Sequence, residues 1–138
     1  LGRIQDSLLR YSESIRVYSD GIEKHPKDYR FHRYRGQRYV SARKFPEAIA
    51  DLKTATKLAP NSFDAAYYLG LAYYFQGDHQ AAAAELSRCE AQTNKPVANP
   101  VDLKGARDCS TFSTDPNALT ALQYWHYLAL RRAGDMAA

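Results

Sequence analysis

Small, aromatic and aliphatic residues recur along this chain at a constant spacing of 34 positions. The spacing is kept by four pairs of residues: Gly36 and Gly70, Tyr39 and Tyr73, Ala48 and Ala82, and Leu52 and Leu86. A fixed period of this length is typical of solenoid proteins, in which each unit buries its apolar face by stacking on the next. We therefore expect an all-α solenoid of antiparallel helix pairs, with a concave face lined by the first helix of each pair.

The second unit shows where its two helices begin and end. Its first helix is expected over Tyr29–Ala42, with a break at Arg43 and Lys44. Pro46 then suits the first turn of the second helix, because a proline there leaves no hydrogen bond unmade. Pro60 ends the unit, since a helix does not continue through proline.

The third unit begins with a helix, Phe63–Gln76, that is apolar on nearly every side. Asn61 or Ser62 is expected to cap its start, Gly77 to end it and Asp78 to cap the next helix. A helix without a polar face is buried on several sides or faces a ligand. Both alternatives stay open for the tyrosines of this helix.

The first and last units are incomplete. Subtracting the period from the second unit places the second helix of the first unit at Ser12–His25 and makes residues 1–11 the end of its first helix. Near the other end, the pair Asp115-Pro116 predicts a helix start, followed by a helix over Ala118–Ala133. A partner for that helix is expected to begin after Asp135.

The segment Asn94–Asn117 interrupts the period. Its prolines, glycine, serines and threonines favour a loop with a short turn at Val101–Arg107. This composition offers little apolar surface to bury, so we expect faster amide exchange here than in the repeats. The expected organisation is one domain: a partial repeat at 1–28, repeats at 29–62 and 63–96, an insertion at 97–117 and a partial repeat at 118–138.

Charge is divided unevenly along the chain, whose net charge is +4 and whose pI is near 9.1. Residues 1–57 contain 13 Lys and Arg against 7 Asp and Glu, a net +6, whereas residues 58–138 contain 6 against 8, a net −2. The basic half suits an acidic partner, but the excess is too small to indicate nucleic-acid binding. Without a membrane-length apolar run or a signal-peptide pattern, we expect a soluble protein, either cytoplasmic or, if exported from a longer precursor, periplasmic.

Two cysteines, Cys89 and Cys109, are too few for a disulfide framework or a zinc site of their own. Cys89 stands at the position that Ala55 and Gly21 hold in the other units, which indicates a small buried residue. Cys109 lies in the insertion, where it is either a free loop cysteine or, in an exported protein, the disulfide partner of Cys89.

The repeated residues resemble the tetratricopeptide repeat (TPR) family, whose pattern places Leu-Gly, Tyr, Ala, a large apolar residue, a small residue and Pro within about 34 residues. The matching residues of the third unit are Leu69, Gly70, Tyr73, Ala82, Leu86 and Cys89, and those of the second are Gly36, Tyr39, Ala48, Leu52, Ala55 and Pro60. The resemblance implies a right-handed superhelix of helix pairs that binds proteins. Two residues depart from the pattern: Arg35 replaces the usual Leu, and Tyr127 replaces a Gly that lets paired helices touch.

No catalytic or metal-binding constellation stands out in the sequence. The glycines are isolated, and no two histidines have the spacing of metal ligands on a helix. Ser110, Thr111 and Ser113 lie near Asp115, but they are typical of loop polarity. We therefore predict a protein that is not an enzyme and needs no cofactor or metal.

The concave surface is the remaining candidate site. By the family's geometry it is expected to carry Arg33, Tyr34, Gln37, Tyr67, Tyr68, Leu71, Tyr74, Tyr124, Trp125 and Leu128. An aromatic groove edged by arginines suits an extended protein or peptide segment with apolar anchors and an acidic group. The alternative is that some of these rings pack inside the superhelix or under the insertion.

TPR domains that bind chaperone C-termini clamp a carboxylate with Lys, Asn and Arg. Here Arg33 alone supplies a suitable cation, and the other positions are held by Tyr68, Ala121 and Trp125. A carboxylate clamp of that type is therefore not expected.

Two further functions stay open beside peptide binding. The chain can be an accessory or regulatory part of a larger enzyme or assembly complex, which the flanking sequence would reveal. It can also self-associate into a homo-oligomer, because the uncapped end of a solenoid exposes apolar surface.

Overall fold

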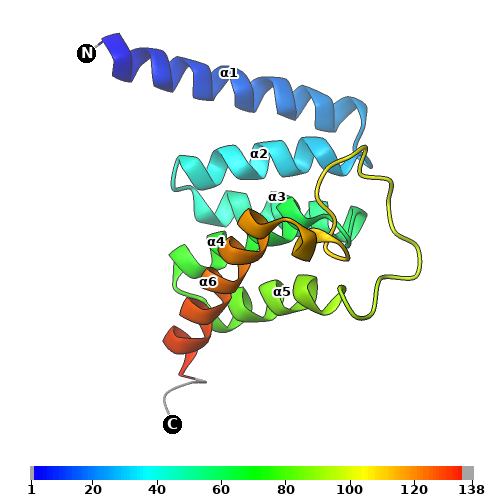
Figure 1. Cartoon of the computed structure of the whole chain (residues 1–138). Coiled ribbons are helices and arrows are strands. Elements are labelled where there is room, and N and C mark those ends of the chain that lie inside the picture. The colour runs from blue at the N-terminus through cyan, green and yellow to red at the C-terminus, as the bar shows by residue number, and fades with distance from the viewer. Residues whose placement is uncertain (1, 135–138) are drawn as a thin grey trace.

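Helices account for most of the computed structural model, which describes residues 2–134 and the side chains from residue 9 onward (Figure 1). The α-helices are α1 (Gly2–Lys24), α2 (Tyr29–Ser41), α3 (Phe45–Leu58), α4 (Phe63–Gln76), α5 (His79–Ala91) and α6 (Pro116–Ala133), and a 3₁₀ turn, η1, spans Phe112–Thr114. Within residues 2–134 the β-type pairing is limited to one isolated bridge between Ser62 and Asp108. The all-α architecture expected from the period is confirmed.

The helices form a stack in which each packs on the next along the chain (Figure 1). Helices α2 and α3 form one antiparallel pair, α4 and α5 form the next, and α6 packs on α5. The first helices of successive units also meet, since α2 contacts α4 and α4 contacts α6. This arrangement is the expected solenoid, and it lines one face with α2, α4 and α6.

The predicted helix boundaries follow local chemistry. Ser62 caps α4 by accepting a hydrogen bond from the Ala65 amide at 3.2 Å, and Asp78 caps α5 by accepting one from Ala81 at 3.1 Å. Gly77 ends α4 with a φ of 97°, a conformation that side chains rarely adopt. The same residue types that predicted these ends therefore form them.

The repeated glycines lie where paired helices cross. A Cβ atom placed on Gly36 would come within 2.6 Å of Leu52 Cγ, and one on Gly70 within 2.7 Å of Leu86 Cδ2. Leu52 and Leu86 are almost fully buried. The crossing is therefore close enough that a side chain at either glycine would displace a core leucine.

Arg35, which replaces a leucine of the family pattern, has its own structural partner. Its guanidinium donates hydrogen bonds to both carboxylate oxygens of Asp51 at 2.7 Å each, and to Ser19 Oγ at 3.1 Å. The Asp51 side chain is only 8% exposed. A bidentate ion pair thus takes the place of apolar packing between α2 and α3, and Ser19 ties it to α1.

The first unit differs from the prediction. The expected break before Ser12 is absent, and α1 runs without interruption from Gly2 to Lys24. In the later units the corner contains a residue with positive φ, Arg43 at 61° and Gly77 at 97°. Leu9 occupies the equivalent position, and because no Gly or Pro lies nearby the helix continues.

The insertion is also more tightly packed than predicted. Leu103 and Phe112 are buried, so the expectation of little apolar burial was wrong. Leu103 packs with Tyr29 and Ala59, on the side of α2 and α3, and the expected turn forms at Lys104 and Gly105. Figure 1 shows the segment leaving α5 and returning across the stack before α6 begins.

The last unit is described as far as Gly134. Its helix starts at Pro116 with Asp115 as the cap, as the pair Asp115-Pro116 predicted. Tyr127, at the family's glycine position, is 46% exposed. The helix expected after Asp135 lies outside the described residues.

Candidate functional site

The predicted groove residues all lie on α2, α4 and α6, the helices that line one face of the stack. Their exposure varies widely: Leu71 is buried, Tyr124 is 56% exposed, and the others are half-buried. The rings of this face are therefore not uniformly accessible. Each part has to be considered with its own neighbours.

Trp125 of α6 is the centre of an aromatic cluster. Its ring lies 5.4 Å from that of Tyr74, 5.5 Å from Phe75 and 5.3 Å from Tyr124, each in an edge-to-face arrangement. Such geometry is favourable because the positive edge of one ring meets the negative face of another. We refer to Tyr74, Phe75, Tyr124 and Trp125 as the aromatic cluster.

Much of the ring surface of the aromatic cluster faces solvent. Tyr124 is 56% exposed and Phe75 is 46% exposed, although both are held by Trp125. Phe45 of α3 extends the surface, with its ring 5.8 Å from that of Phe75, and a shallow pocket of about 160 Å³ lies beside this pair. Exposed rings in fixed positions are suitable anchors for a protein segment.

Tyr67 and Tyr68 lie nearer the core. The Tyr67 ring stacks on Phe63 at 5.5 Å, and Phe63 in turn lies 5.1 Å from Phe112 of the insertion. Burial raises the pKa of Tyr67, and Trp125 beside it offsets part of the rise. Tyr67 therefore joins α4 to α6 and to the insertion. This agrees with the alternative that some of the rings pack under the insertion.

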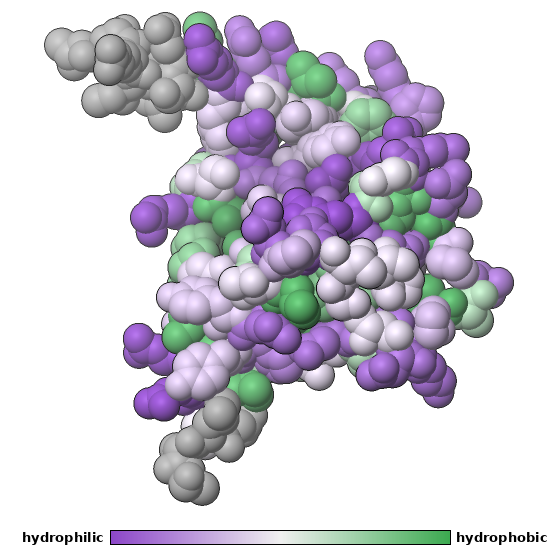
Figure 2. All heavy atoms as spheres, in the orientation of Figure 1, coloured by the Kyte–Doolittle hydropathy of each residue, from purple (hydrophilic) through white to green (hydrophobic). Residues whose placement is uncertain are grey.

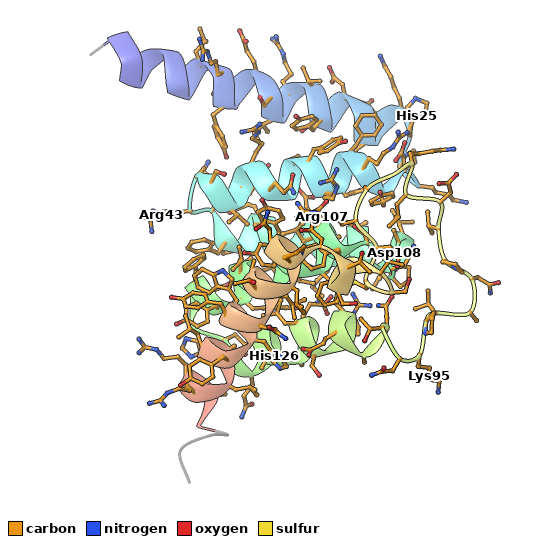
Figure 3. The ribbon with its side chains drawn as sticks, viewed as in Figure 1. His25, Arg43, Lys95, Arg107, Asp108 and His126 are labelled. Atoms are coloured by element: carbon orange, nitrogen blue, oxygen red, sulfur yellow. A yellow bond between two sulfur atoms is a disulfide. The ribbon has the colours of Figure 1, made fainter. Side chains whose placement is uncertain are left out.

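Arg33 does not stand free in the groove. Its side chain is 12% exposed, and its guanidinium lies 3.6 Å from Asp64 of α4. Arg107 of the insertion approaches the other oxygen of Asp64 at 3.3 Å and Asp115 at 4.0 Å. Because the Arg107 side chain is 49% exposed, it is the more accessible cation here, and Figure 3 shows it in front of the helix stack.

The remaining predicted residues have mixed surroundings. The ring of Tyr34 lies 5.4 Å from Tyr18 of α1, and the Arg33 guanidinium lies 4.4 Å from its centre. Tyr34 therefore helps to join α1 to α2. Gln37 and Leu128 are half-buried.

The sequence reasoning missed three residues of this site: Phe45, Phe75 and Arg107. Phe75 lies seven positions after Tyr68, a spacing that returns a helical residue to the same side, so the pattern contained a signal for it. Phe45 and Arg107 gave no such signal, because their proximity to the groove depends on how α3 and the insertion pack.

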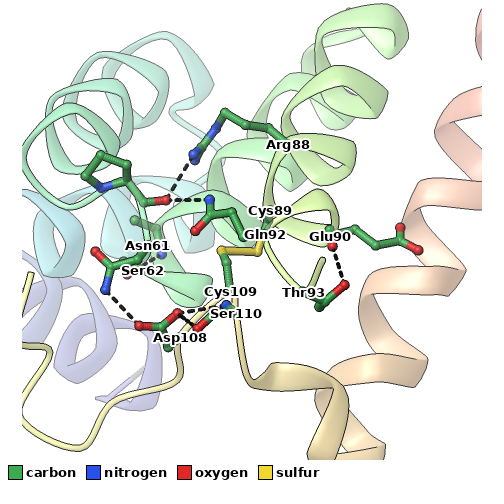
Figure 4. The surroundings of a disulfide bond; sticks show 12 residues. Asn61, Ser62, Arg88, Cys89, Glu90, Gln92, Thr93, Asp108, Cys109 and Ser110 are labelled. Carbon is green, nitrogen blue, oxygen red and sulfur yellow. Dashed lines mark hydrogen bonds between the residues drawn. A yellow bond between two sulfur atoms is a disulfide. The ribbon is translucent and has the colours of Figure 1, made fainter. Parts of the chain in front are cut away.

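The insertion is fixed by a disulfide between Cys89 of α5 and Cys109 (Figure 4). Both cysteines are fully buried, so Cys109 is not the free loop cysteine of one alternative. Nearby, Asn61 donates to Asp108 at 2.8 Å and accepts from the Val101 amide at 3.0 Å. The disulfide and these hydrogen bonds hold the segment that carries Arg107 against the stack.

Asp108 is a carboxylate of the insertion that accepts hydrogen bonds from Asn61 and from the amide and hydroxyl of Ser110. Burial raises its pKa, but hydrogen bonds from Asn61 and Ser110 outweigh that effect and leave the pKa below its usual value. Asp108 therefore stays ionised under ordinary conditions and fixes the loop rather than exchanging protons. Figure 3 shows it beside Arg107 on the same stretch of chain.

Among residues 2–134 no group of three or more His, Cys, Asp or Glu side chains is placed to hold a metal ion. His126 contacts Glu90 at 3.0 Å and joins α6 to α5, and the buried His32 lies 2.9 Å from the Pro26 carbonyl oxygen, so both histidines have structural contacts. Over the same residues, no helix is long and apolar enough to cross a membrane. The surface seen in Figure 2 is mostly hydrophilic, with apolar side chains showing between polar ones.

The fold and its repeats define the class of this protein as an α-helical solenoid of paired helices. Residues 35–96 match the family model for the tetratricopeptide repeat, so the chain contains a TPR domain, as the repeated residues suggested. It is also similar in structure to the solved TPR2B-domain:pHsp70 complex of yeast Sti1, with a TM-score of 0.67 and 19% identity. That match covers 95% of this chain and 91% of the other. No match was found among curated proteins.

Proposed function

We propose that this TPR domain is a non-catalytic interaction module that binds an extended segment of another protein. The segment lies along α2, α4 and α6 and places apolar side chains on the aromatic cluster. The observation that carries the proposal is the exposure of Phe75 and Tyr124, at 46% and 56%, beside the half-buried ring of Trp125.

The contacts of Trp125 explain why these rings suit binding. Phe75 and Tyr124 lie on different helices, yet both rings contact Trp125. Rings that are already held in place lose little conformational entropy when a partner covers them, so more of the contact energy appears as affinity. Aromatic anchors of this kind often dominate the energy of an interface.

Charge in the groove favours apolar over acidic recognition. Arg33 and Arg107 face Asp64, and Arg107 also approaches Asp115, so two cations are balanced by two carboxylates. An acidic group on the bound segment would therefore have to compete with Asp64 and Asp115 for Arg107. We expect such a group to adjust the orientation of the segment and to contribute little affinity.

The solved structure of yeast Sti1 supports a peptide-binding use of this fold, since it is described as a TPR2B-domain:pHsp70 complex. The residues of the present groove indicate a different chemistry. Tyr68, Ala121 and Trp125 stand at the positions where a carboxylate clamp needs polar or cationic groups. We therefore propose a segment recognised through its apolar side chains.

The test is to select binding peptides from a displayed random library and to measure their affinity for variants by calorimetry. Phe75→Ala and Tyr124→Ala should each weaken binding by about 1–3 kcal/mol while the helical signal is unchanged, because both rings are largely exposed. Tyr127→Ala is a matched control, since this ring is also 46% exposed on α6 but contacts Arg131 rather than Trp125. Full-strength binding by both cluster variants, or equal loss in the control, would contradict the proposal.

A further inference from the structure

A second concave feature lies away from the aromatic cluster, between α1 and the end of α2. This cleft has a volume of about 1100 Å³. Its lining residues come from α1 and from the corner that joins α2 to α3: Arg10, Tyr11, Ser12, Glu13, Ser14, Val17, Tyr18, Arg38, Ser41, Ala42 and Lys44. We call it the α1–α2 cleft.

The repeat explains the shape of the α1–α2 cleft. Subtracting one period of 34 residues shows which helices are equivalent. Helix α3 (Phe45–Leu58) corresponds to residues 11–24 of α1, and α4 (Phe63–Gln76) corresponds to residues 29–42, which are α2 and its cap. The space between α3 and α4 is filled by α2, which contacts both. The α1–α2 cleft is therefore the place that a helix equivalent to α2 would occupy.

Side-chain contacts support this equivalence. In the second unit, Tyr39 and Val40 of α2 pack on a buried cluster that includes Ala48, Leu52 and Ala72. One period earlier, these three positions are Ser14, Tyr18 and Arg38, which all line the cleft. The same surface that α2 covers in the second unit is thus open in the first.

The surface of the cleft is partly apolar and differs from its counterpart. Val17 stands where the second unit has Asp51, and it is 58% exposed. Tyr11 adds a ring at the end of the cleft, and its hydroxyl is buried without a hydrogen-bond partner among the described residues. An occupant therefore needs an apolar side chain over Val17.

The charge of the cleft identifies the chemistry of the occupant. Arg10, Arg38 and Lys44 are exposed cations, against one carboxylate, Glu13. Within the described part of the chain, none of the four forms an ion pair within 4 Å. Exposed cations beside apolar side chains favour a helix with carboxylates along one edge.

A second copy of this chain has few acidic groups on the helices that could enter the cleft. Helix α6 has Arg131 and Arg132 in its last turn and no acidic residue in its first turn. Helix α2, which fills the equivalent space, has a basic residue in its last turn as well. Like charges would oppose either contact, so an acidic helix of another protein is the better complement.

We propose that the α1–α2 cleft docks an amphipathic acidic helix of a partner protein, about as long as α2 with its 13 residues. The helix lies between α1 and α2 as α2 lies between α3 and α4. Its apolar edge covers Val17 and Tyr18, and its carboxylates face Arg10, Arg38 and Lys44. This site is separate from the aromatic cluster and does not depend on the peptide proposed there.

The probe is a fluorescein-labelled peptide of about 16 residues made of Leu, Ala and Glu, with Glu at i and i+4 so that the carboxylates share one edge. A matched peptide replaces every Glu by Lys. Fluorescence anisotropy with the whole 138-residue chain should show binding of the acidic peptide only, and the affinity should fall as salt is added.

The decisive variant is Arg38→Glu/Lys44→Glu, which reverses two exposed cations of the cleft. We expect at least a roughly tenfold loss of affinity for the acidic peptide. Lys53→Glu/Lys57→Glu is the matched control, because both lysines are exposed on α3 and do not line the cleft. Tyr124→Ala should also leave this affinity unchanged, whereas it should weaken the binding of peptides selected for the aromatic cluster.

Several outcomes would overturn the proposal. Equal loss in the two charge-reversed variants would mean that the peptide responds only to overall charge. Equal binding of the acidic and lysine peptides would exclude recognition by the cations of the cleft. If sedimentation shows a dimer that the Arg38→Glu/Lys44→Glu variant abolishes, the occupant is a second copy of the chain.

Discussion

Single residues decide how closely the helices of this domain approach one another. Gly36 and Gly70 each face a buried leucine of the partner helix at a distance that leaves no room for a Cβ atom. At the crossing of α2 and α3 the chain also uses charge, because Arg35, next to Gly36, joins α2 to Asp51 of α3 through two hydrogen bonds. The glycine–leucine contacts and the ion pair each involve few residues, so each can be tested by substitution.

Gly70→Leu should destabilise the domain by about 2–4 kcal/mol, because the new side chain must displace Leu86 from the core. Thermal or urea unfolding would measure the loss. Ala84→Leu is a suitable control, since Ala84 is exposed on the same helix as Leu86 and an added side chain there meets solvent. A loss below about 0.5 kcal/mol for Gly70→Leu would mean that the helices do not cross at this residue.

Asp51→Ala should cost about 2–3 kcal/mol, because it leaves the Arg35 guanidinium half-buried without its carboxylate. The double variant Arg35→Leu/Asp51→Ala should recover most of that stability, since leucine is the family's usual residue at this crossing and needs no partner. Urea unfolding of the two variants and the parent measures both changes. A double variant that is less stable than Asp51→Ala would show that the ion pair itself is required.

At the scale of elements, the insertion behaves as a strap rather than a free loop. It is joined to α5 by the Cys89–Cys109 disulfide and to the start of α4 by Asn61. Its 3₁₀ turn adds Phe112 to the core cluster that contains Phe63 and Leu122. The strap therefore connects the third unit to α6 and places Arg107 at the edge of the groove.

Removing the disulfide should lower stability by about 3 kcal/mol, because the bond closes a loop between residues 20 positions apart. Cys89→Ser/Cys109→Ser and treatment of the parent with reductant should give similar losses. Mass measurement with and without reductant and alkylation shows whether the bond is present in the purified protein.

Hydrogen exchange should divide the strap into two parts. The Val101 and Cys109 amides, which donate to Asn61, should exchange slowly, whereas amides around the exposed Lys95 and Asn99 should exchange fast. Figure 3 shows Lys95 pointing away from the stack. Uniformly fast exchange over the whole strap would contradict the packing described above.

At the scale of the molecule, stacking gives the domain two different surfaces. The units between α2 and α6 close on one another, and their first helices present the aromatic cluster. The first unit instead leaves the α1–α2 cleft open, because α1 continues where later units turn. One proposed site thus lies where α4 meets α6, and the other lies beside the helix that does not turn.

The sequence by itself determined the repeat, the helix pairs and most helix ends. These features depend on residues close together in the chain or one period apart, such as the glycine pair and the caps Ser62, Asp78 and Asp115. Their physical causes are local backbone preferences and repeated packing, which a pattern can express. The positions of the groove helices followed from the same period.

Only the tertiary structure decided what the non-repeated parts do. The pairing of Cys89 with Cys109, the burial of Phe112 and the approach of Arg107 to Asp64 all depend on the path of a loop whose composition gives no period. The exposure of each groove ring was likewise undetermined, because a tyrosine suits a core and a binding surface equally well. Tyr67 packs against the core and Tyr124 faces solvent because of what surrounds each ring, although one helix pattern predicted them both.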